Sequence, residues 1–348
     1  MRARRLARSA LTQRSAALVD VARQTCGIHA QVQASAELQL AARVDGIAQQ
    51  DVRDALWRER TLVKAWTLRG TLHLHPADEL PLWFATRSPR DELPPWPDPA
   101  GVLHPAVSAE EVAELRAAVW DAAGGEPLLR EQLVDAVVRR VGKTHEARLR
   151  SGFAFFIGDL CQGPPQGNKI TLVRPDRWLG RWERVKRADA LREILRRFLW
   201  AYGPARPADF RAWFGSDVPF EDVEEVEVEG RRAFVLAGDT GFAEPERSVR
   251  LLPEYDVYVM GFREREQLVA PRVREQVAGH GRGRYEGPAG VSFLLADGVA
   301  AGLWSRKKTP KRLELSVAPA KRVSRTALKR EAERYSAFLG LELELTVA

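Results

Sequence analysis

The pattern of apolar and polar positions over the first quarter of the chain predicts three helices and then a hairpin of two strands. Apolar residues recur at helical spacing, and two short alternating runs then flank the turn Arg69-Gly70. This order is typical of a winged helix, in which the hairpin is the wing. The expected segments are a helix over 6–25 ended by Gly27, an irregular stretch over 28–34, a helix capped by Ser35 with Glu37 in its first turn, a helix over 49–57, and strands over 62–68 and 71–75.

The same order of elements returns twice, as a repeat of pattern and not of sequence. A Pro- and Gly-rich segment over 94–105 predicts a linker before the second copy. The second copy comprises helices from Ser108, over 128–141 and over 147–161, a turn over 164–168 and a strand over 169–173. The third comprises helices over 188–202, over 207–214 and after Pro219, with strands over 226–228 and 233–236.

Beyond Gly241 the pattern changes to short strands with one good helix, over 324–339. The strands are expected over 249–252, 255–260, 291–295, 299–304, 313–317 and 341–347. The predicted fold is therefore α+β, with three tandem winged-helix units and a β-rich C-terminal subdomain. We expect the winged helices at 1–93, 106–180 and 186–240, and the C-terminal subdomain at 241–348.

Composition favours a globular cytoplasmic protein without a cofactor. The 348 residues are 45% hydrophobic and 29% charged, and no apolar run approaches the length of a membrane span. The basic N-terminus leads into amphipathic sequence without the apolar core of a signal peptide. The two cysteines, Cys26 and Cys161, exclude a disulfide framework and have no metal-ligand spacing.

Charge is distributed unevenly along the chain. Residues 306–334 hold eleven basic and three acidic side chains, whereas residues 217–229 hold seven acids and no base. The net charge of +7 then suggests a basic surface that faces a polyanion, although ordinary solvated faces would give the same count. Together with the predicted winged helices, this basic surface favours duplex DNA as the partner. Arg69 at the hairpin tip is where a phosphate contact is expected, and the alternative is that Arg69 is a solvated turn residue.

The motif Gln31-Val32-Gln33 is the best candidate for chemistry. In an extended or irregular segment, residues two apart point to the same side, so both amides could hold one water while Val32 turns into the core. On a regular helix the two side chains would diverge. Composition alone would make both of them ordinary surface glutamines.

Several motifs in order along the chain resemble the AlkZ/YcaQ-like family of winged-helix DNA glycosylases. Besides the Gln pair they are Leu68-Arg69-Gly70-Thr71-Leu72-His73-Leu74, Leu251-Leu252-Pro253-Glu254-Tyr255-Asp256, and the run from Ala296-Asp297-Gly298-Val299 to Gly302-Leu303-Trp304. The resemblance implies a concave, DNA-sized channel formed by the winged helices and a catalytic pair at Gln31 and Gln33. It also implies removal of alkylated purines and, in some members, unhooking of interstrand crosslinks.

The chemistry of such lesions suits a pair of amides. Glutamine is neither a general base nor a general acid, but a purine alkylated at N7 or N3 is already cationic and leaves as a neutral base. A positioned water then completes the hydrolysis at the oxocarbenium-like sugar. The lysine nearest in sequence is Lys64, so an imine-forming lyase is not expected.

The expected partner is double-stranded DNA with alkylated purines or crosslinks, bound by a monomer without metal. The residues expected to contact DNA are Arg69, Thr71 and His73 in the first wing, Arg282 and Arg284 in a Gly-rich loop, and Arg306 and Lys307. His73 and His75 could instead form a metal pair, but no third ligand is evident. The alternative function is that of a DNA-binding regulator without catalytic activity.

Overall fold

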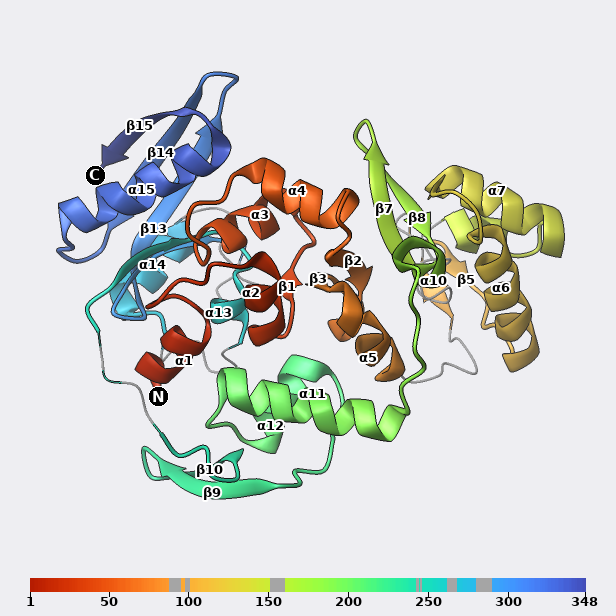
Figure 1. Ribbon diagram of the computed structural model, residues 1–348, viewed down its shortest axis with the longest axis horizontal. Coiled ribbons are helices and arrows are strands. Elements are labelled where there is room, and N and C mark those ends of the chain that lie inside the picture. Colours follow the sequence, from red (N-terminus) through yellow and green to blue (C-terminus); the bar gives the residue numbers. More distant parts are fainter. Residues whose placement is uncertain are drawn as a thin grey trace. The chain divides into compact units, whose positions relative to one another are not determined.

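The computed structural model of the chain describes residues 1–87, 95–97, 101–150, 160–241, 244, 246–261, 268–279 and 290–348. Their contacts divide them into two compact units. The first contains Met1–Asp54, Leu74–Pro76 and Leu191–Ala348, and the second contains Ala55–His73 and Ala77–Ala190. Figure 1 labels the elements of both units, and the mixed α+β composition predicted from the sequence is confirmed.

The first segment forms two short helices rather than the single helix predicted over 6–25, and that prediction is wrong. They are α1 (Arg2–Arg8) and α2 (Leu18–Gln24). Between them Ala10 adopts a left-handed φ of 52°, which interrupts the helix, and Ser15 pairs with Val44 in an isolated bridge. The next elements are β1 (Ile28–His29), α3 (Gln33–Ala41) and α4 (Gln49–Trp57), of which α4 is as predicted.

The first predicted hairpin is present. Its strands are β2 (Leu62–Trp66) and β3 (Leu72–Pro76), and a 3-10 turn, η1 (Leu68–Gly70), joins them. Arg69 and Gly70 both have left-handed backbones, with φ of 50° and 73°, which turns the chain sharply. The Thr67 amide closes the turn by donating to the Thr71 carbonyl at 3.0 Å. Two further helices follow, η2 (Ala77–Glu79) and α5 (Leu80–Ala85).

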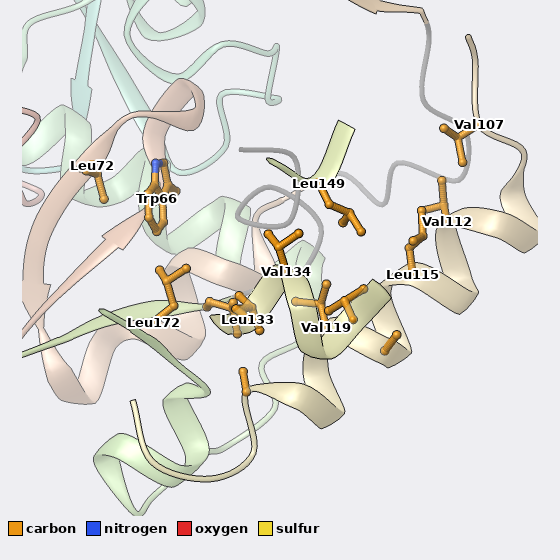
Figure 2. Packing of buried hydrophobic residues seen from close by; sticks show 14 residues of the cluster. Trp66, Leu72, Val107, Val112, Leu115, Val119, Leu133, Val134, Leu149 and Leu172 are labelled. Atoms are coloured by element: carbon orange, nitrogen blue, oxygen red, sulfur yellow. The ribbon is translucent and has the colours of Figure 1, made fainter. Parts of the chain in front are cut away.

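The second unit has a core between two helices and the strands that follow them. The helix α6 (Ala109–Ala122) begins after Ser108, as predicted, and Ser108 caps it in a capping box with Glu111. Figure 2 shows the buried cluster, to which α6 and α7 (Arg130–Val141) contribute half of the side chains. The remaining elements here are β4 (Trp96–Pro97), β5 (Leu103–His104), β6 (Leu128–Leu129), α8 (Glu146–Arg148), β7 (Cys161–Gln166), β8 (Lys169–Val173) and α10 (Pro175–Leu179).

The helix predicted over 147–161 does not reach Cys161. Cys161 begins β7, which pairs antiparallel with β8 and with β2 through Ala65, while residues 151–159 lie outside the described part of the chain. The hairpin of β7 and β8, predicted to be a second wing, therefore turns at Gly167 and Asn168, and the predicted turn residues Pro164–Gln166 lie within β7. In the sheet β2, β7, β8 and β6 are neighbours in that order.

The third predicted unit has two of its three helices, α11 (Arg187–Tyr202) and α12 (Pro207–Phe214). The helix expected after Pro219 is absent from the described residues 215–222, so this part of the prediction is wrong. Phe220 instead packs edge-on against Phe210 and Phe234, which anchors the chain as it enters the hairpin of β9 (Val223–Val228) and β10 (Arg231–Leu236).

The C-terminal part of the first unit is a five-stranded sheet in the order β11-β12-β13-β14-β15. Figure 1 labels β13, β14 and β15 of this sheet. All pairs are antiparallel except β14 with β15, which α15 connects as a crossover helix. A sharp turn at Asp297 and Gly298, with φ of 55° and 76°, joins β12 to β13. The elements are β11 (Val249–Leu252), β12 (Ser292–Ala296), β13 (Val299–Lys308), β14 (Arg312–Pro319), α15 (Arg325–Leu339) and β15 (Glu342–Val347).

Two short helices precede β12, where the sequence pattern predicted a strand over 255–260 and no helix. Residues Val257–Met260 form α13 and not a strand, because the Asp256 carboxylate accepts a bond from the Tyr258 amide at 2.9 Å and caps a helical turn. Pro271–Gly279 form α14, which the sequence did not predict. Among the described residues, we find no helix with the length and apolar character that crossing a membrane requires.

Candidate active site

The Gln pair lies where β1 ends and α3 begins. Gln31 is in a bend, Val32 is the extended N-cap residue with φ −109° and ψ 108°, and Gln33 is the first residue of the helix. The geometry is therefore that of an irregular entry into a helix, in which the two glutamines flank one extended residue. Gln31 is exposed and Gln33 is half-buried.

Two details of this segment differ from the prediction. The helix begins before Ser35, because the amides of Ser35 and Ala36 already bond to the Val32 carbonyl, each at 3.1 Å. The Ser35 hydroxyl does not cap the helix and instead donates to the carbonyl of Glu254. Val32 is 38% exposed and does not turn into the core. The surface formed by Gln31, Val32 and Gln33 is therefore accessible from solvent.

Glu37 lies one helical turn after Gln33 and is a buried residue. The Gln33 amide nitrogen Nε2 donates to Glu37 Oε1 at 3.3 Å. Gln49 and Arg53 of α4 bond to the same carboxylate, with Gln49 Nε2 at 2.5 Å from Oε2 and Arg53 Nε at 3.3 Å from Oε1. A buried negative charge thus lies directly behind one member of the pair.

The opposite side of α3 is fixed to the segment that follows β11. Gln39 bridges two chain segments, since its Nε2 donates to the His29 carbonyl at 2.9 Å and its Oε1 accepts from the Val257 amide at 3.2 Å. Arg43 and Asp256 form a fully buried ion pair. The motif Leu251–Asp256, one of those that carried the family resemblance, therefore supports the helix that begins with Gln33.

Glu254 and Arg306 form a second ion pair beside this segment. Both guanidinium nitrogens of Arg306 bond to the carboxylate, at 2.9 and 3.0 Å, and the Ser292 hydroxyl donates to it at 3.0 Å. Burial tends to raise the pKa of Glu254, but the hydrogen bonds and charge of Arg306, a backbone hydrogen bond and the bond from Ser292 together outweigh burial and hold the pKa below its usual value. Arg306, expected at the DNA surface, is thus half-buried and paired with Glu254.

In the first wing, the structure places one of the three expected DNA contacts inside the protein. Arg69 is exposed at the turn and Thr71 is half-buried, with its hydroxyl bonded to the Leu68 carbonyl at 3.0 Å. His73 is only 3% exposed, and its Nδ1 lies 3.2 Å from the Thr67 hydroxyl and 3.1 Å from the Thr71 carbonyl. The His73 ring therefore orders the turn that presents Arg69.

Several basic side chains of the segment 306–334 pair with acids, either within the segment or elsewhere in the chain. Lys307 is exposed and pairs with Glu314 at 3.4 Å. Arg312 contacts Glu342 and Glu344 at 3.7 and 3.6 Å, and Arg334 pairs with Asp45 at 2.7 Å. The excess of charge counted along the sequence is thus partly balanced in the fold. Arg282 and Arg284 lie outside the described residues.

His75 is fully buried against the turn that ends α2. Burial, followed by the nearby charge of Arg197, lowers the pKa of His75 to about 3, so the ring is neutral at physiological pH. A Cβ at Gly27 would lie 2.4 Å from its Cε1 atom. Within the described ranges, no group of three or more His, Cys, Asp or Glu side chains is placed to hold a metal ion.

Comparisons with known proteins define the class of protein to which this fold and site belong. Residues 22–338 match the family described as "DNA glycosylase AlkZ-like". The sequence is 31% identical over 321 residues to the "Interstrand DNA cross-link repair glycosylase" of Streptomyces sahachiroi, covering 84% of this chain and 82% of the relative. The solved structure of "Streptomyces sahachiroi DNA glycosylase AlkZ" matches all of this chain and 98% of its own, with a TM-score of 0.80 and 29% identity.

The protein is therefore a DNA glycosylase, an enzyme that hydrolyses the N-glycosidic bond between a base and its sugar. It belongs to the AlkZ-like family, as the sequence motifs indicated.

The contact of Glu37 with Gln33 and with two residues of α4 does not follow from the predicted elements. With a helix that starts at Ser35, Glu37 falls in the first turn and Gln33 lies outside the helix. Once α3 starts at Gln33, the spacing of four residues places Glu37 beside Gln33, and Gln49 and Arg53 have the same spacing on α4. The signal was present in the sequence, but it depended on where the helix begins.

Proposed function

We propose that this DNA glycosylase releases cationic N7- or N3-alkylated purines from duplex DNA, through a water molecule held by Gln31 and Gln33. The observation that supports this best is the placement of the two amides around one extended residue, at the solvent-accessible start of α3. Neither amide donates a proton to a leaving base, so the substrate must be a base that leaves without one.

The reaction requires little more than position and electrostatics. The alkylated purine carries its positive charge into the reaction and departs as a neutral base, which leaves an oxocarbenium-like sugar. A water with its protons directed at the two amide oxygens has its lone pair free to attack that sugar. As the new C–O bond forms, this water loses one proton to solvent, because neither amide is a base. Holding water close to the reacting carbon removes much of the entropic barrier of a reaction between separate molecules.

We further propose that crosslinked DNA is among the substrates, because the Streptomyces relative is named an interstrand DNA cross-link repair glycosylase. Gln31 and Val32 are exposed and Gln33 is only half-buried. An amide pair on an accessible surface suits a bulky lesion better than an enclosed pocket would, because a closed pocket admits only a flipped, unlinked base.

DNA binding in this proposal rests mainly on phosphate contacts. Arg69 has an exposed side chain on a sharp turn, and Lys307 is exposed at the end of β13. Arg306 and Thr71 remain proposed contacts through their accessible atoms, whereas His73 would act by ordering the turn. The hairpins β2–β3 and β7–β8 would serve as wings of a monomer. The acidic strand β9, with exposed Glu224, Glu225 and Glu227, would face away from phosphates.

The substrate assignment is tested with three defined duplexes. We expect release of 7-methylguanine from one duplex and no release of uracil or hypoxanthine from two others, each followed as abasic-site formation. Without a proton donor, uracil and hypoxanthine would have to leave as anions, which are poor leaving groups. Release of uracil at a rate comparable to that of 7-methylguanine would contradict the proposal. The same assay in EDTA should give an unchanged rate, because the proposed chemistry uses no metal.

A further inference from the structure

Glu37 is a buried carboxylate that directly contacts a proposed reacting group, Gln33. Its side chain is 3% exposed, and it accepts hydrogen bonds from Gln33, Gln49 and Arg53. Gln33 and Glu37 are one turn apart on α3, and Gln49 and Arg53 are one turn apart on α4. The two helices therefore meet at this carboxylate through matched positions.

We propose that Glu37 is a positioning residue that fixes which way the Gln33 amide faces. A glutamine amide has a donor end and an acceptor end, and rotation by half a turn exchanges them. An ionised carboxylate only accepts hydrogen bonds, so it must face the NH2 group. The Gln33 oxygen is thereby directed away from Glu37, which is the orientation that a water-holding amide needs.

The neighbours of Glu37 support this role. Gln49 also directs its NH2 group at the carboxylate, at 2.5 Å, which limits the rotation of the carboxylate itself. The Arg53 guanidinium supplies a counter-charge at 3.3 Å and is 48% exposed, so the charge of Glu37 is balanced without another buried cation. If the Gln33 amide were reversed, two acceptor oxygens would lie in contact inside the protein, which is strongly unfavourable.

The inference rests on the proposed function, because it gives Gln33 its correct orientation for holding water. The variant that tests it is Glu37→Gln, which keeps the shape of the side chain but lets it donate as well as accept. The matched control is Glu331→Gln, which replaces a buried, ion-paired carboxylate in the same unit that contacts Arg14 and Arg250. Should Glu37→Gln fail to fold, Glu37→Asp keeps the charge and withdraws the acceptor by one methylene.

The measurement is the single-turnover rate of 7-methylguanine release, together with the Kd for a duplex of the same sequence. We expect Glu37→Gln to lower the rate by about tenfold or more with Kd unchanged, because it removes an interaction that matters for the reacting geometry and not for binding. Glu331→Gln should leave the rate within about twofold of wild type. An unchanged rate in folded Glu37→Gln, or in Glu37→Asp where only that variant folds, overturns the inference.

A second readout separates this inference from the proposed function. Selective nitrogen-15 labelling of glutamine shows the side-chain NH2 resonances, and Gln33→Ala identifies the one from Gln33. We expect that resonance to shift in Glu37→Gln and to stay in place in Glu331→Gln. A Gln33 resonance unaffected by Glu37→Gln contradicts the contact. A wild-type rate in Gln33→Ala instead contradicts the catalytic pair, whatever the resonance does.

Discussion

Arg43 and Asp256 form a paired hydrogen-bonded salt bridge, with guanidinium-to-carboxylate distances of 2.8 and 2.7 Å and both side chains fully buried. The pair joins the end of α3 to the segment after β11, across more than two hundred positions in the sequence. Burial is the largest influence and tends to lower the pKa of Arg43, but the charge of Asp256, its hydrogen bonds, and the nearby Tyr202 and Tyr335 together outweigh burial, so the pKa lies above its usual value. The helix that begins with Gln33 is therefore held at its far end by a buried charge pair.

Breaking this pair should destabilise the protein strongly. We expect Asp256→Asn to lower the free energy of unfolding by about 3–5 kcal/mol, because it leaves the Arg43 charge buried without its partner. The exposed pair of Lys329 and Glu333 on α15 is the control, and Glu333→Gln should cost less than about 1 kcal/mol. Urea denaturation of both variants measures the difference. Equal losses in the two variants would contradict the role assigned to the buried pair.

Gly27 should tolerate no side chain. Its φ of 96° disfavours any other residue, and a Cβ there would lie 2.4 Å from the His75 ring, which is itself fully buried. We expect Gly27→Ala to cost well over about 1 kcal/mol, the usual cost of a left-handed backbone alone. Gly46 provides the comparison, since its φ is 70° and nothing lies within 4 Å of its would-be Cβ. Gly46→Ala should show only the backbone cost in the same thermal or urea measurement.

His75 should make stability depend on pH. Its pKa falls from 6.5 to about 3 on folding, so between these values the unfolded chain binds a proton that the native protein does not. Stability is then retained above pH 6.5 and decreases as pH falls, by up to about 1.4 kcal/mol per pH unit from this group. Urea midpoints measured between pH 7.5 and 5 test this. In His75→Gln the slope of stability against pH over that range should be smaller, whatever the absolute stability of the variant. A slope identical to that of wild type would exclude His75 as the source of the pH dependence.

Much of the fold could be predicted because its signals are local. The capping box of Ser108 and Glu111, the turn pair Arg69-Gly70 and the alternation of the C-terminal strands each depend on residues close in sequence. The prediction over Tyr255–Met260 failed because an apolar run of that length suits a strand or a helix, and the Asp256 cap decides for the helix.

The candidate site could be predicted less completely, because its supporting contacts are long-range. The sequence indicated Gln31 and Gln33, but the bonds from Ser35 to Glu254 and from Gln39 to Val257 join segments far apart in the chain. Counting charges along the sequence has the same limit. It does not show that Arg306 pairs with Glu254, so it overstates the positive charge that the segment 306–334 leaves unpaired.

Arg69 should contribute one phosphate contact to DNA binding. We expect Arg69→Ala to weaken binding to duplexes of any sequence and to reduce the slope of log affinity against log salt by about one. Arg211 is a suitable control because it is exposed and removes the same charge elsewhere. Arg211→Ala should leave the slope unchanged. Equal changes of the slope in both variants would show that the effect comes from net charge alone, and would contradict a specific role for Arg69 in the hairpin turn.

The most direct test of the account is the rate of 7-methylguanine release from duplex DNA by Gln31→Ala, Gln33→Ala and the double variant, measured under single-turnover conditions. We predict that the rate of the double variant is lower by at least about a hundredfold, because removing groups that activate or position a nucleophile typically slows a reaction by that factor or more. The Kd for DNA and the urea midpoint should remain close to wild type, because the pair holds water and neither DNA nor the core. A double variant that binds DNA normally and releases 7-methylguanine at the wild-type rate would contradict the account.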